Sequence, residues 1–111
     1  MSFHQFCSSD PWFEHIKSGR KIYEGRRYWD KTKDIKPGDT IEFKSVTSGD
    51  TFEKKVKNIT ICDTFEHALN TFPLQNILPG IQTIEEGVQV YLKYVSLKTQ
   101  KENRVCIIEL I

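Results

Sequence analysis

Residues 19–26 (GRKIYEGR) constrain the fold most, because they carry charged side chains where a β-strand is expected to begin. Successive side chains of a strand point to opposite faces, so Glu24 and Arg26 share one face and Lys21 lies on the other. A face with an acid and an arginine either forms an exposed or structural ion pair or lines a cavity. A bulge near Gly25 would bring Lys21 to the same cavity, since glycine in a strand often marks such a distortion.

The length and charge of the chain set limits on its organisation. A chain of 111 residues predicts a single domain, residues 1–111. The net charge of +1 gives no global basic field for unspecific nucleic-acid binding, so a nucleic-acid role needs a local patch. No apolar run approaches the roughly 18–20 residues that span a bilayer, and the N-terminus lacks the pattern of a signal peptide. We therefore predict no membrane partner and a cytoplasmic protein, with the nucleus as the alternative.

The three cysteines, Cys7, Cys62 and Cys106, do not form a metal-binding pattern. No CxxC motif occurs, and no histidine stands at zinc-finger spacing from a cysteine. Each cysteine lies in or beside an apolar, strand-like segment, which predicts buried, reduced thiols. We expect neither a metal nor a cofactor.

The hydrophobic patterning predicts strands and helices in a mixed order. A first helix is expected to begin near Pro11, with Ser9 or Asp10 as N-cap, and to end at Gly19. Two later helices are expected to begin at the capping residue Thr64 and at the capping-box residue Thr83. Strands are expected over residues 3–7, 40–44, 52–61 (with a bulge near Asn58) and 104–111, with the last of them central, and residues 31–34 and 98–103 are expected to be polar loops.

These elements indicate the α+β class. About five or six strands, joined mainly by hairpin-length turns, and about three helices predict a mixed or antiparallel β-barrel.

A basic and aromatic run, Arg26 to Trp29, follows the charged segment. Arginines beside aromatic rings can bind a nucleic-acid backbone and stack a base, here on Tyr28 or Trp29. The alternative is that Tyr28 or Trp29 packs on the core while the charges stay solvated.

The order of several short motifs resembles the ASCH domain family of the PUA-like superfamily, over most of the chain. The resemblance implies a PUA-like barrel with a cleft between barrel and helices, and binding of RNA or nucleotide-like ligands. The motifs are IKSGRK (16–21), IYEGR (22–26), IKPGDTIEF (35–43), TFEHAL (64–69), YLKY (91–94) and VCIIEL (105–110).

The resemblance also raises enzymatic alternatives. Some small bacterial members are amidohydrolases that deacetylate N4-acetylcytidine, using a lysine, a threonine three residues later and a distant glutamate. Lys21 matches the lysine, whereas Glu24 stands at the place of the threonine and the distant glutamate has no clear match. Another member has been viewed as a ribonuclease.

Three functions remain open. In the first, the chain binds RNA or a modified nucleoside: Lys21 and Arg26 meet phosphate or a polar base edge, Glu24 accepts from an amino group, and Tyr28 or Trp29 stacks a base. In the second, it is a hydrolase in which Lys21 acts as base or nucleophile and Glu24 moves a proton. In the third, it is a protein-interaction module. We favour the first as the prediction.

Overall fold

Five strands form one mixed sheet in the order β1-β3-β4-β5-β2 in the computed structural model, which describes residues 1–111. β1 runs parallel to β3, and the other three neighbouring pairs are antiparallel. The strands are β1 (Phe3–Ser8), β2 (Tyr23–Arg27), β3 (Thr40–Ser45), β4 (Thr51–Cys62) and β5 (Val105–Leu110). The helices are α1 (Trp12–Lys17), α2 (Asp30–Lys33), α3 (Phe65–Thr71), α4 (Leu74–Ile77), α5 (Ile84–Leu92) and α6 (Leu97–Asn103).

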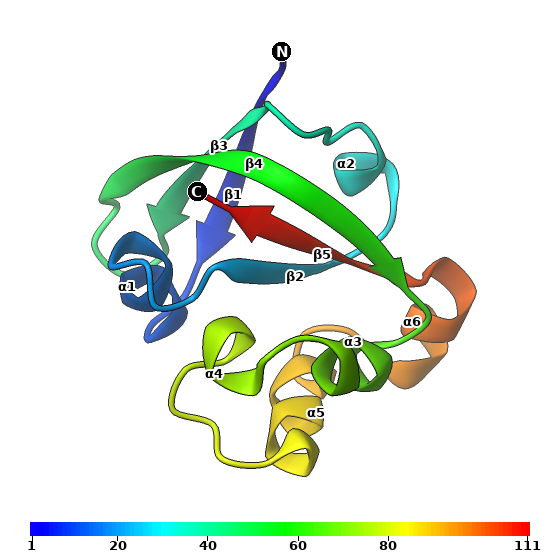
Figure 1. The fold of residues 1–111 in the computed structure, drawn as a ribbon. Coiled ribbons are helices and arrows are strands. Elements are labelled where there is room, and N and C mark those ends of the chain that lie inside the picture. Colours follow the sequence, from blue (N-terminus) through cyan, green and yellow to red (C-terminus); the bar gives the residue numbers. More distant parts are fainter.

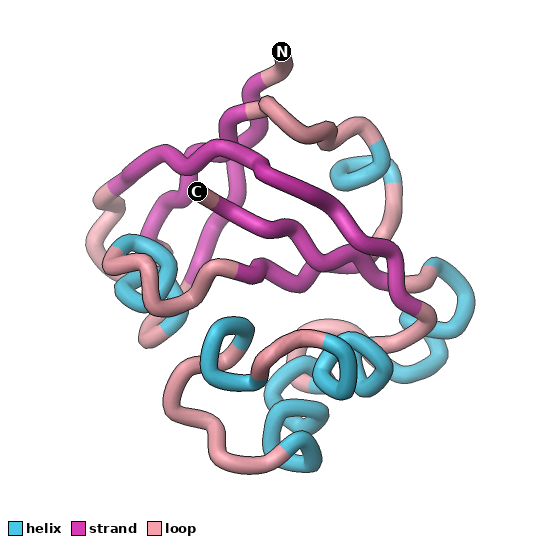
Figure 2. The backbone as a smooth tube through the Cα atoms, viewed as in Figure 1, coloured by secondary structure: helices cyan, strands magenta, loops and turns pink.

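The sheet curls into a barrel that its two edge strands do not close. β1 and β2 stand at opposite ends of the strand order and share no backbone pairing. The long strand β4 arches across the barrel, and α3, α4 and α5 gather on the far side of β2 (Figures 1 and 2). The unpaired edges of β1 and β2 are therefore the place where the barrel wall is open.

β5 separates two hydrophobic clusters. Cys106, Ile108 and Leu110 pack in the barrel cluster, whereas Val105 and Ile107 pack in a second cluster under the helices. This alternation follows from the period of two in a strand, and it buries both faces of β5. The predicted central position of the last strand is confirmed.

Several sequence predictions of the fold are confirmed. The α+β class and the mixed barrel-like sheet are present, and the strand predicted over residues 40–44 is β3, which buries Ile41 and Phe43. The register of β4 against β5 shifts between Val56 and Asn58, at the predicted bulge. The Thr64 and Thr83 side chains cap α3 and α5 by accepting backbone N–H groups.

The prediction of about three helices was wrong, because the structure has six. Residues 31–34 and 98–103, which were predicted to be loops, lie largely in α2 and α6. Both helices are short and polar, and polar side chains hold them. The Thr32 hydroxyl accepts from Trp29 N–H and donates to the Arg27 carbonyl. The buried Gln100 side chain joins α6 to α3 through Phe65 N–H.

Two local predictions near the N-terminus were also wrong. Neither Ser9 nor Asp10 caps α1 with its side chain; Pro11 occupies the N-cap position, and the Ser9 backbone carbonyl accepts from Phe13 N–H. Cys7 is exposed, whereas Cys62 and Cys106 are buried. Along β1 the side chains of Phe6 and Ser8 point inward, so the alternation of the strand turns Cys7 outward.

No helix is long and apolar enough to cross a membrane.

Asp39 organises the start of the barrel. Its buried carboxylate accepts from Ser2 N–H at 2.9 Å and Lys36 N–H at 3.0 Å, and its Oδ2 lies 2.9 Å from His4 Nε2. These hydrogen bonds, with that to His4 the largest contribution, lower the pKa of the Asp39 carboxyl from 3.8 to about 2. The folded state therefore gains stability from the ionised carboxylate.

We predict that Asp39→Asn lowers the free energy of unfolding by about 2 kcal/mol at neutral pH, because charge-assisted hydrogen bonds are lost. Since the folded pKa is the lower one, the contribution is complete above pH 3.8 and disappears as the pH falls towards about 2. Urea unfolding of both proteins at several pH values measures the difference. Asp50→Asn, at an exposed aspartate in the β3–β4 turn, is the control. A difference that persists unchanged to pH 2 would contradict the assignment.

Candidate functional site

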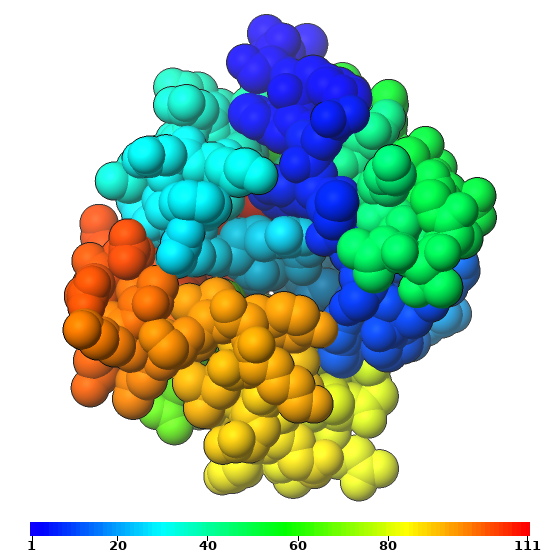
Figure 3. Space-filling view, turned by 180° about the vertical axis from the view of Figure 1, so that it is seen from behind, coloured from blue at the N-terminus to red at the C-terminus, as the bar shows by residue number.

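A cavity of about 560 Å³ lies where the edges of β1 and β2 fail to pair. Its wall comes from β1, β2, the α2 region and the segment from α5 to α6. In Figure 3 the hollow is visible from its open side, with light-blue β2 at its floor between dark-blue β1, the cyan α2 region and the orange segment around α5 and α6. The opening of the barrel is thus also a concave site.

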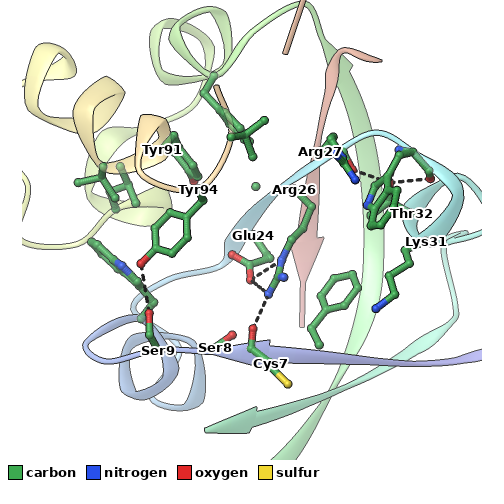
Figure 4. Close-up of a pocket in the computed structure, with 18 of the residues that line it drawn as sticks. Cys7, Ser8, Ser9, Glu24, Arg26, Arg27, Lys31, Thr32, Tyr91 and Tyr94 are labelled. Carbon is green, nitrogen blue, oxygen red and sulfur yellow. Dashed lines mark hydrogen bonds and ion pairs between the residues drawn. The ribbon is translucent and has the colours of Figure 1, made fainter. Parts of the chain in front are cut away.

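Glu24 lies in this cavity beside two cations. Arg26 Nε and Nη2 donate to Glu24 Oε2 at 3.2 and 2.9 Å, and Lys21 Nζ lies 3.5 Å from Glu24 Oε1. Arg26 Nη2 also donates to the Cys7 carbonyl at 3.1 Å, which links β2 to the facing edge of β1 (Figure 4). Glu24 and Arg26 therefore form an ion pair and line a cavity, so the two alternatives drawn from the sequence coexist.

Lys21 reaches the cavity by a different route from the predicted one. It precedes β2, which begins at Tyr23, and the pairing of β2 with β5 continues through Gly25 without a bulge. Because Lys21 is outside the strand, alternation does not direct it away from Glu24. Its buried ammonium group donates to the Tyr23 and Ile77 carbonyls. The backbone of α4 thus helps to hold Lys21 against Glu24.

The electrostatics of the cluster differ between the two buried partners. Burial lowers the pKa of the Lys21 ammonium; Glu24 opposes this shift, and Arg26 adds to it. Burial alone would raise the pKa of the Glu24 carboxyl, but Arg26 and Lys21 together outweigh burial and lower it. Glu24 has two cations beside it, whereas Lys21 has one anion and a further cation. Glu24 is therefore held ionised, and Lys21 gives up its proton more readily than an exposed lysine.

Aromatic side chains form much of the remaining wall. Trp12, Trp29, Phe65, Tyr91 and Tyr94 line the cavity, and these include both tryptophans of the chain. Tyr91 stacks on Phe65 with ring centroids 4.0 Å apart and the rings nearly parallel. The Tyr94 hydroxyl lies 3.2 Å from the Ser9 hydroxyl, which connects the segment after α5 to the segment after β1 across the cavity (Figure 4).

Two buried hydroxyl groups in the wall have no hydrogen-bond partner. They are Ser8 Oγ, at the end of β1, and Tyr91 Oη, on α5. Burial raises the pKa of the Tyr91 phenol, and the Glu24 charge adds to the rise, so this group stays a neutral hydroxyl that can donate. A buried polar group without a partner costs about 1–3 kcal/mol. The wall therefore contains two hydroxyls whose hydrogen-bonding capacity is unused.

The predicted site residues separate into two sets. Lys21, Glu24, Arg26 and Trp29 line the cavity, whereas Tyr28 lies outside its wall and packs partly buried against the barrel cluster. Trp29 is 37% exposed, and the Arg27 guanidinium lies 3.8 Å from its ring centroid. Tyr28 therefore follows the alternative of packing on the core. Trp29 lies in the wall of the cavity.

Other wall residues were not predicted from the sequence. Trp12, Tyr91 and Ser8 line the cavity but are not among the site residues predicted from the sequence. Periodicity does identify a buried face, but it does not tell whether that face borders a core or a cavity. The tyrosines at 91 and 94 within the YLKY motif were the available signal.

Nothing in the structure resembles a metal centre, since no three His, Cys, Asp or Glu side chains converge. The chemistry available in the cavity is that of a carboxylate, a buried amine, guanidinium groups, hydroxyls and aromatic rings.

Comparison with known proteins identifies the family. The family model of the ASCH domain matches residues 8–109. The chain belongs to the ASCH domain family. It is similar to the crystal structure of hypothetical protein PH0355, with a TM-score of 0.88 and 36% identity over 99% of this chain and 97% of that one.

A second solved relative shows the same extent of similarity. The solution NMR structure of protein PF0455 from Pyrococcus furiosus has a TM-score of 0.79 and 35% identity, covering 99% of this chain and 96% of that one. No curated protein matches the chain. The ASCH resemblance and the PUA-like fold predicted from the sequence are confirmed.

Gly25 leaves room for the aromatic wall. A Cβ atom at this position would lie 2.8 Å from Tyr91 Oη, which is too close, and 3.0 Å from Phe65 Cε1, which is a tight contact. The two stacked rings cannot both retreat, because Phe65 and Tyr91 are buried. The close approach of α5 to β2 thus depends on the missing side chain.

We predict that Gly25→Ala destabilises the protein by about 1–3 kcal/mol through overpacking. Adding Tyr91→Phe removes the shortest contact and should restore part of the loss, which urea unfolding of the single and double variants measures. If Gly25→Ala is as stable as the wild type, the tight packing of Tyr91 against β2 is incorrect.

Proposed function

We propose that this ASCH protein binds a nucleobase in the cavity, either from a modified nucleoside or nucleotide or from unpaired RNA. The observation that carries the proposal is the ionised Glu24 at the buried end of an aromatic-walled cavity. Its Oε2 is occupied by Arg26, while Oε1 has only the 3.5 Å contact with Lys21. A carboxylate with a free lone pair accepts from an exocyclic amino group such as cytosine N4.

The walls and size of the cavity support this ligand class. Flat aromatic side chains stack on nucleobases, and each such contact is worth about 1–3 kcal/mol. A volume of about 560 Å³ falls within the usual range for sites that enclose a small molecule. The unpartnered hydroxyls of Ser8 and Tyr91 add positions for a base carbonyl or ring nitrogen.

Binding can be read from intrinsic fluorescence, because both tryptophans line the cavity. We expect cytidine, N4-acetylcytidine or another member of a panel of ribonucleosides and short single-stranded RNAs to quench this fluorescence saturably. Glu24→Gln should weaken binding of amino-bearing bases by ~10-fold or more, because a charged acceptor is replaced by a neutral amide. Calorimetry on the same panel provides an independent affinity.

Two control variants separate binding from folding. Glu53→Gln changes an exposed glutamate on β4, outside the cavity, and should leave binding intact. Tyr91→Phe removes a buried hydroxyl that has no partner, so stability should hold or rise while affinity falls. Saturable quenching by no member of the panel would count against the proposal and in favour of a protein-interaction role.

A second candidate function rests on the contact between Lys21 and Glu24. The two side chains meet in one concave site at 3.5 Å, as a hydrolase of the amide-cleaving kind requires. Burial lowers the pKa of Lys21, which increases the fraction of neutral amine that can act as a base. The ionised Glu24 can accept and return a proton beside it.

We predict that, if the cavity is catalytic, the wild type releases cytidine and acetate from N4-acetylcytidine and Lys21→Met abolishes this turnover. Chromatography of the reaction measures the product, and circular dichroism checks that the variant folds. Lys57→Met, at an exposed lysine on β4, is the control. Saturable binding of N4-acetylcytidine without any product would contradict the hydrolase function and support binding only.

A further inference from the structure

The charge of the cavity wall differs from that of the whole chain. Four basic side chains and one acidic side chain line the cavity, whereas the chain as a whole carries a net charge of only +1. The remainder of the molecule is therefore net negative. A concave surface with excess positive charge attracts and holds an anion.

The four cations are not equivalent. Lys21 and Arg26 are engaged by Glu24 at the buried end. Arg27 and Lys31 form no ion pair with any acidic side chain. The acids of the neighbouring α2 segment, Asp30 and Asp34, are exposed and do not line the cavity. The uncompensated charge thus belongs to Arg27 and Lys31.

These two cations stand at the more open end of the site. Lys21 and Glu24 are buried, Arg27 is half-buried, and Lys31 is exposed. The Arg27 guanidinium lies on the ring of the exposed Trp29, which orients it and leaves its N–H groups free at the rim. In Figure 4, Arg27 and Lys31 come from the opposite side of the view to Tyr91 and Tyr94, with Glu24 and Arg26 between them.

The spacing along β2 fits an elongated ligand. Glu24 and Arg27 are three residues apart on β2, which separates their Cα atoms by about 10 Å at the rise of a β-strand. Alternation directs their side chains to opposite faces of this edge strand, and both residues line the cavity. A molecule that reaches Glu24 with one end and Arg27 with the other is longer than a nucleobase alone. A base joined through its ribose to a phosphate has this length and carries negative charge at the required end.

From this charge distribution we infer a phosphate subsite, formed by Arg27 and Lys31, for a nucleotide whose base lies against Glu24. The inference rests on the proposed function and deepens it, because it makes the ligand a phosphorylated nucleoside and not a neutral one. Arginine binds phosphate oxygens through its planar N–H groups, and lysine contributes a point charge. The chemistry is shared by a free nucleotide and by a phosphate of an RNA strand.

We predict that a ribonucleoside 5′-monophosphate binds ~10-fold more tightly than the same nucleoside at low salt, because charge-assisted hydrogen bonds are added. The test compares the four ribonucleosides and N4-acetylcytidine with their 5′-monophosphates by tryptophan fluorescence. Lys31→Gln should reduce the advantage of the phosphate while leaving nucleoside affinity nearly unchanged, and Arg27→Gln should also reduce that advantage. Added salt should reduce the difference in affinity between the monophosphate and the nucleoside, since exposed charges are screened.

Lys33→Gln is the matched control. Lys33 lies on the same short helix as Lys31, but its Nζ is directed to Tyr28, 5.6 Å from the ring centroid, and it does not line the cavity. This variant should keep the full advantage of the phosphate. An equal loss in Lys33→Gln and Lys31→Gln would indicate a general charge effect and overturn the subsite.

The outcomes separate the subsite from the proposed function. Equal affinities for nucleoside and monophosphate, both weakened by Glu24→Gln, would overturn the phosphate subsite and leave base binding in place. Absence of binding by every probe would overturn both. Tighter binding of a cytidine-containing trinucleotide than of the monophosphate, with the same dependence on Lys31, would support the subsite and assign its phosphate to an RNA strand.

Discussion

The burial of the Glu24 carboxylate between Lys21 and Arg26 is the interaction on which the site depends. Removing a carboxylate from water costs several kcal/mol, and only well-placed cations and hydrogen bonds offset this cost. The same Arg26 guanidinium that compensates Glu24 also bonds to the Cys7 carbonyl, and the same Lys21 ammonium bonds to the Ile77 carbonyl. One charged cluster therefore joins β1, β2 and α4, which are remote from each other in the sequence.

Much of the fold could be predicted from the sequence because its signals are local. Hydrophobic patterning indicated the strands β3 and β5, and the hydroxyls of Thr64 and Thr83 marked the starts of α3 and α5. The short helices α2 and α6 escaped prediction because they lack an apolar stripe. What stabilises them is side-chain hydrogen bonding by Thr32 and Gln100, whose partners depend on the folded chain.

The site was predictable only in part, for a related reason. The charged residues of the segment 19–26 predicted a cluster, and Lys21, Glu24 and Arg26 do lie together in the cavity. The predicted cause, a bulge at Gly25, was wrong: Lys21 converges with Glu24 because it precedes the strand. The opposite wall, which contains Tyr91, could not be assigned to a cavity from the sequence. A helix face has the same apolar periodicity whether it borders a hydrophobic core or a cavity.

The unclosed seam between β1 and β2 has a consequence for how proteins of this kind can diverge. Where two strands pair, their separation is set by backbone hydrogen bonds and is the same for every sequence. Across this seam the separation is spanned by side chains such as Arg26, which reaches the Cys7 carbonyl, so it can vary with residue size. Substitutions along the two strand edges can therefore reshape the binding chamber while the hydrogen-bonded ladder of the other strands stays the same. The fold can therefore be conserved while the ligand that the cavity binds changes.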